Sequence, residues 1–142
     1  MADSLFDIAR FRIKEALAEH PQITLNEADQ SISVEAKDES GYDVRLQDDG
    51  QVATIYAGPY HEHFEDPDSA AACFIWMLTP AYRVVEVRKG KHIVGADLER
   101  IVGGKVEQMG RFRILFPLFG KKEARVLQNS HLPVPDGDRG DG

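Results

Sequence analysis

The chain has 142 residues, of which 42% are hydrophobic and 29% charged, and its formal net charge is −7. That length suits one ordinary domain with a single core. An acidic chain lacks the concentrated lysine and arginine surface that neutralises a phosphate backbone, so we expect no nucleic-acid partner. No apolar run approaches the ~20 residues of a membrane span, and the N-terminus does not resemble a secretory signal. We therefore expect a cytoplasmic protein with no membrane partner.

A first helix is predicted to begin at Ser4. Ser4 and Asp7 have the spacing of a capping box, in which each side chain satisfies an unpaired backbone N–H. The helix should end before Pro21, because the residue preceding proline is pushed out of the α region. Apolar residues recur on one face at Phe6, Ala9, Ile13, Ala16 and Leu17.

Residues 31–37 and 42–47 alternate as two half-buried strands, and Gly41 between them suits a left-handed turn position. A second hairpin is predicted at Asp49-Gly50, which is a type I′ turn signal. The expected buried pairs are Val34 with Leu46, Ala36 with Val44, Leu46 with Ala53, and Val44 with Ile55. These three strands should form a meander with one buried face.

A second helix is predicted from Asp66 as N-cap and Pro67 at the first helical position to about Leu78, before Pro80. Residues 70–78 have almost no polar side. The only cysteine, Cys73, lies in this segment, so no intrachain disulfide forms and the thiol should be buried and inert.

The rest of the chain reads mainly as strands. A hairpin about Lys89-Gly90 is expected to pair Val85 with Val94 and Val87 with His92. Residues 107–116 are predicted to form a further strand with Phe112, Ile114 and Phe116 on one side, and residues 121–128 a short helix. Residues 133–142 lack apolar anchors and should be a disordered acidic tail.

The predicted fold is therefore a single α+β domain over residues 1–132. It has an antiparallel sheet of five to six strands in two hairpin groups, with two helices packed on one face, in the order α-βββ-α-ββ(β).

One short motif is able to carry metal chemistry. In an extended strand, His61, His63 and Glu65 share a face, and two imidazoles with a carboxylate form a ligand set for a divalent transition metal. His92 and His131 supply a fourth ligand only if folding brings them near. Residues 61–63 resemble the His-x-His motif of cupins, which implies a metal ion, although the glutamate spacing and the element order differ. The competing interpretation is a polar approach to the second helix that needs no cofactor, with histidines that face water or titrate at an interface.

Other catalytic signatures are weaker. Ser69 and Ser130 lack a nucleophile-elbow context, and no glycine-rich phosphate loop precedes a helix. The aspartate pairs are explained by the turn at residues 48–49 and by the helix start at residues 66–68. The sequence therefore favours a protein that is not an enzyme.

The second helix has more apolar surface than a sheet alone can cover. Either the first helix covers the surplus, or Trp76, Ala72 and Met77, beside Cys73, meet a second subunit or another protein. The order of elements resembles the secretion-chaperone type of fold, which implies a dimer that binds client segments. We expect a non-catalytic protein-interaction or adaptor domain that forms a homodimer or binds another protein, with a metal-dependent enzyme as the alternative.

Overall fold

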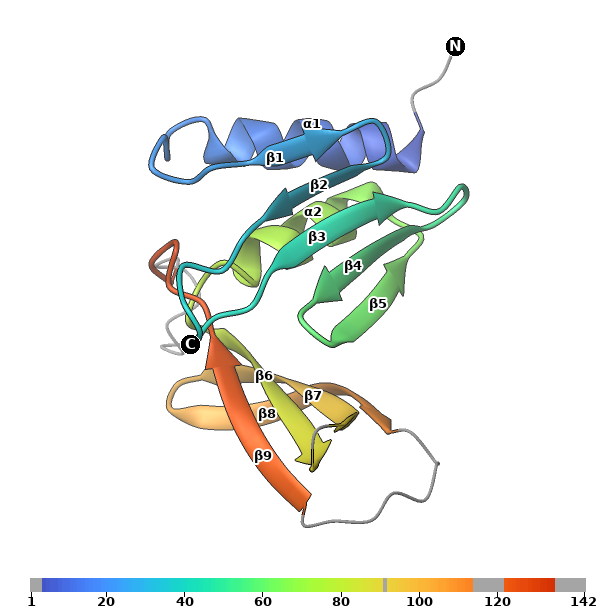
Figure 1. Cartoon of the computed structure of the whole chain (residues 1–142). Coiled ribbons are helices and arrows are strands. Elements are labelled where there is room, and N and C mark those ends of the chain that lie inside the picture. The colour runs from blue at the N-terminus through green and yellow to red at the C-terminus, as the bar shows by residue number, and fades with distance from the viewer. Residues whose placement is uncertain (1–3, 91, 114–121, 135–142) are drawn as a thin grey trace.

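The structure is a computed structural model that describes residues 4–90, 92–113 and 122–134. Within these ranges the helices are α1 (Leu5–Leu17) and α2 (Pro67–Trp76) (Figure 1). The strands are β1 (Asn26–Ala28), β2 (Ser31–Val34), β3 (Val44–Asp48), β4 (Ala53–Ala57), β5 (Tyr60–Phe64), β6 (Tyr82–Lys89), β7 (His92–Val102), β8 (Lys105–Arg113) and β9 (Lys122–Gln128). Neither described helix has the length and apolarity needed to cross a membrane.

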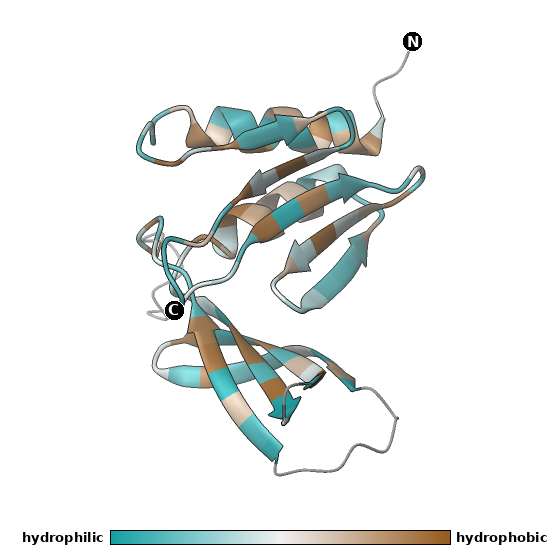
Figure 2. Ribbon diagram, viewed as in Figure 1, coloured by the Kyte–Doolittle hydropathy of each residue, from teal (hydrophilic) through white to brown (hydrophobic). Residues whose placement is uncertain are grey.

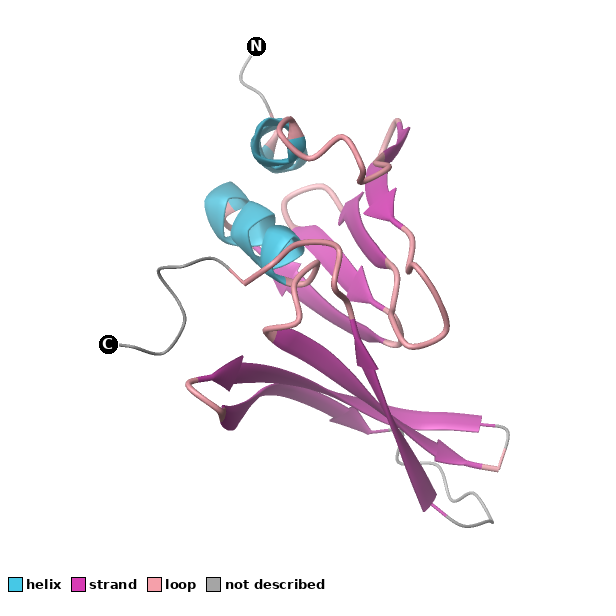
Figure 3. Cartoon of the chain, turned by 90° about the vertical axis from the view of Figure 1, so that its left-hand side faces the viewer, coloured by secondary structure: helices cyan, strands magenta, loops and turns pink. Residues whose placement is uncertain are grey.

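The strands form two antiparallel sheets, so the predicted α+β class is confirmed. The first sheet has the order β1-β2-β3-β4-β5 and the second the order β8-β7-β6-β9. Figure 3 shows both helices on one side of the first sheet and the second sheet across one end of these layers. The prediction of two helices on one face holds for the first sheet, whereas the strands are divided between two sheets.

Both helices begin where their capping residues predict. The Ser4 hydroxyl accepts the Asp7 N–H at 3.1 Å, and the Asp66 carboxylate accepts the Ser69 N–H at 2.9 Å. α1 packs along α2 with its apolar stripe buried, so the first helix covers much of the surplus apolar surface of the second. The buried residues of the two helices are Phe6, Ala9, Ile13, Leu17, Ala70, Ala71 and Phe74.

The register of the first sheet differs from the prediction. Val34 pairs with Val44 rather than with Leu46, and Leu46 pairs with Ile55 rather than with Ala53. Each shift is two residues, so the same side chains stay on the buried face. The turns cause the shifts: residues 35–43 form a long loop, and residues 49–52 form a wider turn closed by the Asp49 N–H on the Val52 carbonyl.

Two glycines have roles other than those predicted. Among the described residues only glycines have positive φ, so Asp49 does not adopt the conformation that a type I′ turn requires, although Gly50 does at +87°. Gly41 is not left-handed. A Cβ there would lie 2.6 Å from Asn129 Oδ1, so Gly41 is needed for this close approach.

The second sheet contains two further corrections. In the β6–β7 hairpin Val85 faces Asp97 and Val87 faces Gly95, because Lys89 pairs with His92 and a bulge follows Val87. Residues 122–128 form the strand β9 rather than a helix, because they pair along the whole of β6. The predicted strand at 107–116 exists as β8 up to Arg113; its end at residues 114–116 and the predicted tail from residue 135 lie outside the described residues.

One buried side chain ties the second sheet to the first. Asn129, which follows β9 and is 2% exposed, accepts the Tyr42 N–H at 3.0 Å and donates to the carbonyls of Tyr42 and Met77 at 2.9 and 3.0 Å. The Tyr42 hydroxyl donates to the same Met77 carbonyl at 3.0 Å. Val84, Ala96, Leu98 and Leu127 of the second sheet then join the core formed by the helices and the first sheet.

A second contact between the sheets is steric. The Tyr60 hydroxyl on β5 lies where a Cβ of Gly110 on β8 would be, at 1.9 Å. Only glycine admits this contact without a shift of the Tyr60 side chain or of the strand. The Tyr60 end of β5 therefore lies against the second sheet.

We predict that Asn129→Ala lowers the free energy of unfolding by about 2–4 kcal/mol, because the buried amide N–H and carbonyls would lose their partners. Asn129→Asp should lose at least as much, since a carboxylate accepts from Tyr42 but cannot donate to the two carbonyls. Urea unfolding measures both. Ser130→Ala, at the exposed neighbouring position, is the control and should stay within about 0.5 kcal/mol of wild type; a stable Asn129→Ala would contradict the bridging role.

Candidate functional site

The predicted histidines lie on β5, on the face of the first sheet opposite the helices. His61 and His63 are exposed and share this face, as an extended strand requires. Their ring centroids are 5.7 Å apart in an edge-to-face arrangement. The strand pairs with β4, which places Tyr56 opposite His61 and Thr54 opposite His63.

His63 is held by a buried hydroxyl and a carboxylate. Thr54 Oγ1, which is fully buried, lies 2.7 Å from His63 Nδ1 and donates its proton to Asp49 Oδ2. Asp49 Oδ1 accepts a further hydrogen bond from Gln47 Nε2 at 3.2 Å. The turn after β3, the strand β4 and the strand β5 thus each contribute one member of an Asp49–Thr54–His63 chain.

His61 lies among aromatic rings. Its centroid is 5.7 Å from that of Tyr56 and 6.5 Å from that of Phe112 on β8. The Arg45 guanidinium stacks 4.5 Å above the Tyr56 ring, which extends the row across β3. The aromatic surface around His61 therefore extends from the first sheet to Phe112 on the second.

Glu65 does not complete a three-ligand site. It lies one residue beyond the end of β5 and is exposed. Within the described ranges, no group of three or more His, Cys, Asp or Glu side chains is placed to hold a metal ion, so His92 and His131 do not join the pair either. The metal-dependent enzyme remains a prediction.

The predicted interface residues on α2 differ in exposure. Ala72 is exposed and Trp76 is partly exposed, with its ring 6.3 Å from Tyr82 and edge to face. Met77 is fully buried, which corrects its assignment to a surface. Met77 keeps a helical backbone and follows buried Phe74 by three residues, so it lies on the buried face of α2, and its carbonyl accepts hydrogen bonds from Tyr42 and Asn129.

The environment of Cys73 disfavours its thiolate form. Burial raises the pKa of its thiol to about 12, and the negative charge of Glu62 adds to the effect. The thiol is therefore protonated at neutral pH, whereas the thiolate is the reactive species. Cys73 is only partly buried, so the expected full burial is not found, whereas its raised pKa agrees with an inert thiol.

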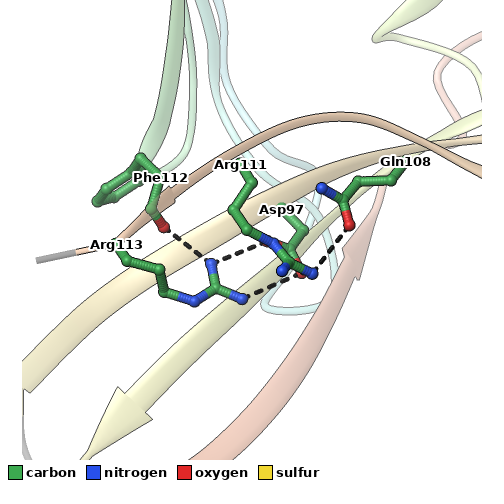
Figure 4. A network of polar contacts seen from close by, with 5 residues as sticks. All are labelled: Asp97, Gln108, Arg111, Phe112 and Arg113. Carbon is green, nitrogen blue, oxygen red and sulfur yellow. Dashed lines mark hydrogen bonds and ion pairs between the residues drawn. The ribbon is translucent and has the colours of Figure 1, made fainter.

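The second sheet holds a charge network that the sequence did not indicate (Figure 4). Asp97 on β7 is 7% exposed, and its two oxygens accept hydrogen bonds from Arg111 and Arg113 on β8 at 2.8–3.3 Å. Arg111 also donates to Gln108 at 2.8 Å. Burial alone would raise the pKa of Asp97, but the hydrogen bonds and charges of Arg113 and Arg111 outweigh it and lower that pKa.

Gly95 makes this network possible. A Cβ at Gly95 would lie 2.6 Å from both Arg113 Cδ and the Phe112 carbonyl oxygen. Arg113 Nη1 itself donates to that carbonyl at 2.8 Å, so the arginine lies flat across its own strand. Arg111 and Arg113 alternate about Phe112, which places both arginines on one face of the strand. Their partner Asp97 was not identifiable from the sequence, because the β7–β8 register contains a bulge.

The second sheet also exposes large apolar side chains. Val106 and Met109 on β8 are 48% and 45% exposed, and Val126 on β9 is 50% exposed. Figure 2 shows hydrophobic and hydrophilic residues alternating along β9. The first five residues of β8 are all exposed, which leaves Val106 and Met109 on an open strand.

Comparison with known proteins gives no significant match to a family model, a curated protein or a solved structure. The functional assignment therefore depends on the geometry of these surfaces.

We predict that Asp97→Asn destabilises the protein by about 1–2 kcal/mol at pH 7, because two arginines lose their anionic partner while remaining partly hydrated. The folded-state pKa of Asp97 is lowered, so its contribution is present above the unfolded value of about 3.9 and is lost as pH falls through the folded value. Between pH 5 and pH 2 the free energy of unfolding should therefore fall less in Asp97→Asn than in wild type. The difference between the two decreases should be on the order of 1–2 kcal/mol. Urea unfolding across that range measures the difference.

Glu107→Gln on β8 serves as the control, since Glu107 is an exposed carboxylate of the same hairpin. It should keep the wild-type stability at pH 7. Identical pH profiles for Asp97→Asn and wild type would show that the network does not stabilise the folded state.

Proposed function

We propose that the protein is a non-catalytic protein-interaction or adaptor domain that pairs with a second copy of itself through the free edge of β8. The observation that carries the proposal is a nine-residue edge strand whose first half is exposed and bears Val106 and Met109. An unpaired strand edge is a template for another strand.

The other described edge strands are shorter, and each contacts another part of the chain at one point at least. β1 has three residues, and its Glu27 forms an ion pair with Lys14 of α1 at 3.2 Å. The Tyr60 end of β5 lies against the second sheet. The end of β9 is bonded to the loop at residues 35–43, where the Gln128 N–H donates to the Ser40 carbonyl at 2.7 Å.

β8 is the longest described edge strand, with nine residues against seven in β9. Among the described strands it pairs only with β7, and no other described segment forms a backbone hydrogen bond with it. Met109 is the extra residue of a bulge, because Leu98 pairs with Gly110 and Glu99 with Gln108. A partner strand would therefore pair with residues 105–108, the regular segment before the bulge.

That segment is complementary to itself. A two-fold axis at Val106 in an antiparallel pair sets Val106 against Val106 of the partner subunit, and Lys105 against Glu107 of the partner subunit. Two apolar side chains then meet at the axis and two opposite-charge pairs flank them. This complementarity favours a second copy over an unrelated strand.

The test is the mass in solution. Wild type should elute with twice the chain mass of 15.9 kDa in light-scattering chromatography. Val106→Lys, which puts two like charges on the axis, should raise the dissociation constant of the dimer at least about tenfold. Lys105→Glu should weaken the dimer as well, and the pair Lys105→Glu with Glu107→Lys should restore it.

Val126→Lys on β9 is the matched control, since it adds the same charge at a valine of equal exposure on the opposite edge. It should leave the dimer intact. A monomeric wild-type protein at high concentration would refute the proposal, and loss of the dimer in Val126→Lys alone would assign the interface to β9.

A further inference from the structure

We propose that His61 and His63 form a two-histidine binding site for a divalent transition-metal ion, with Thr54 and Asp49 orienting His63 for metal binding. This inference is independent of the β8 interface. It rests on the shared face of His61 and His63 on β5 and on the hydrogen bonds of the buried Thr54 hydroxyl with Asp49 and His63.

The proton arrangement follows from the donors and acceptors available. The Thr54 hydroxyl has one proton, and it donates that proton to the Asp49 carboxylate. The same oxygen can then only accept from His63 Nδ1, so Nδ1 carries the N–H. The neutral His63 ring therefore has its lone pair on Nε2, the nitrogen that does not face Thr54.

This arrangement matches the way proteins prepare a histidine ligand. A metal-bound imidazole usually donates its other N–H to a carboxylate or another acceptor, which fixes the tautomer and the ring orientation. Thr54 is fully buried, so water does not compete for this hydrogen bond. The exposed side of His63 thus presents a preoriented donor atom.

His61 supplies the second ligand at a suitable distance. An ion about 2.1 Å from each ring nitrogen lies about 3.2 Å from each ring centre, so two ligands at 90–110° have centroids about 4.5–5.2 Å apart. The observed separation is 5.7 Å. Because the two rings lie edge to face, a shared ion requires them to move about 1 Å closer and to rotate about their side-chain torsions until one ring nitrogen of each faces the ion.

The donor set defines the class of metal. Imidazole nitrogens suit Zn²⁺, Cu²⁺ and Ni²⁺ rather than Mg²⁺ or Ca²⁺. No third His, Cys, Asp or Glu of the described chain joins the pair, so the remaining positions would belong to water. A site with two protein ligands binds more weakly than a closed structural zinc site.

The test is calorimetric titration of the purified full chain, without an affinity tag, with Zn²⁺. We expect one ion per chain, and His61→Ala and His63→Ala should each weaken binding at least about tenfold. Thr54→Val keeps both ligands but removes the hydroxyl, and should weaken binding about tenfold, in the range found for outer-shell changes. His92→Ala, at an exposed histidine on β7, is the matched control and should bind as wild type does.

A metal-free measurement tests the orienting role separately. Long-range proton–nitrogen NMR correlations should show His63 as the Nδ1–H tautomer in wild type and should show that preference lost in Thr54→Val. Asp49→Asn should also lose it, because an amide donating to Thr54 frees the hydroxyl proton for His63 Nδ1. This variant replaces Thr54→Val if the latter does not fold.

Zinc binding that is unchanged in the His61→Ala, His63→Ala double variant, or no zinc binding by wild type, would overturn the site. An Nε2–H tautomer in wild type, or wild-type affinity in both Thr54→Val and Asp49→Asn, would overturn the role of Thr54 and Asp49.

Discussion

The arrangement of the two sheets depends on the buried Asn129 amide. Its three hydrogen bonds join the segment after β9 to the loop before β3 and to the end of α2. All three partner groups are backbone atoms, so the amide fixes the position of the segment after β9 relative to the backbone at Tyr42 and Met77. The second sheet is thereby held where Val84 and Leu127 enter the core and where Gly110 meets Tyr60. That placement brings the Tyr60 end of β5 against β8 and leaves the first half of β8 exposed.

The sequence predicted features that depend on neighbouring residues and missed those that depend on distant ones. The helix starts at Ser4 and Asp66 are set by capping side chains three residues from their partners, and both were located correctly. The registers were displaced because turn length depends on contacts such as that of Gly41 with Asn129, far along the chain. β9 was mistaken for a helix because its strand character comes from pairing with β6.

The candidate sites follow the same division. The shared face of His61 and His63 follows from strand periodicity alone, whereas Thr54 becomes the partner of His63 only through the β4–β5 register. Asp97 was unremarkable in the sequence, since its two arginines lie across a strand pair that contains a bulge. Met77 is wrong as a surface residue because it follows buried Ala70 and Phe74 by seven and three residues and so lies on the same helical face.

The histidine pair and the exposed end of β8 are linked by one strand but separated along it. Phe112, which contacts His61, is six residues from Val106, a length of about 20 Å in an extended strand. No side chain spans that distance, so a charge at Val106 does not reach the histidines directly. The bulge at Met109 and the Arg111 contact with Asp97 lie between them, and the Arg113 contact with Asp97 follows Phe112. Both halves of β8 pair with β7, but the half after the bulge contributes Phe112 to the histidine surface and the half before it carries the exposed Val106, so one strand serves two separate surfaces.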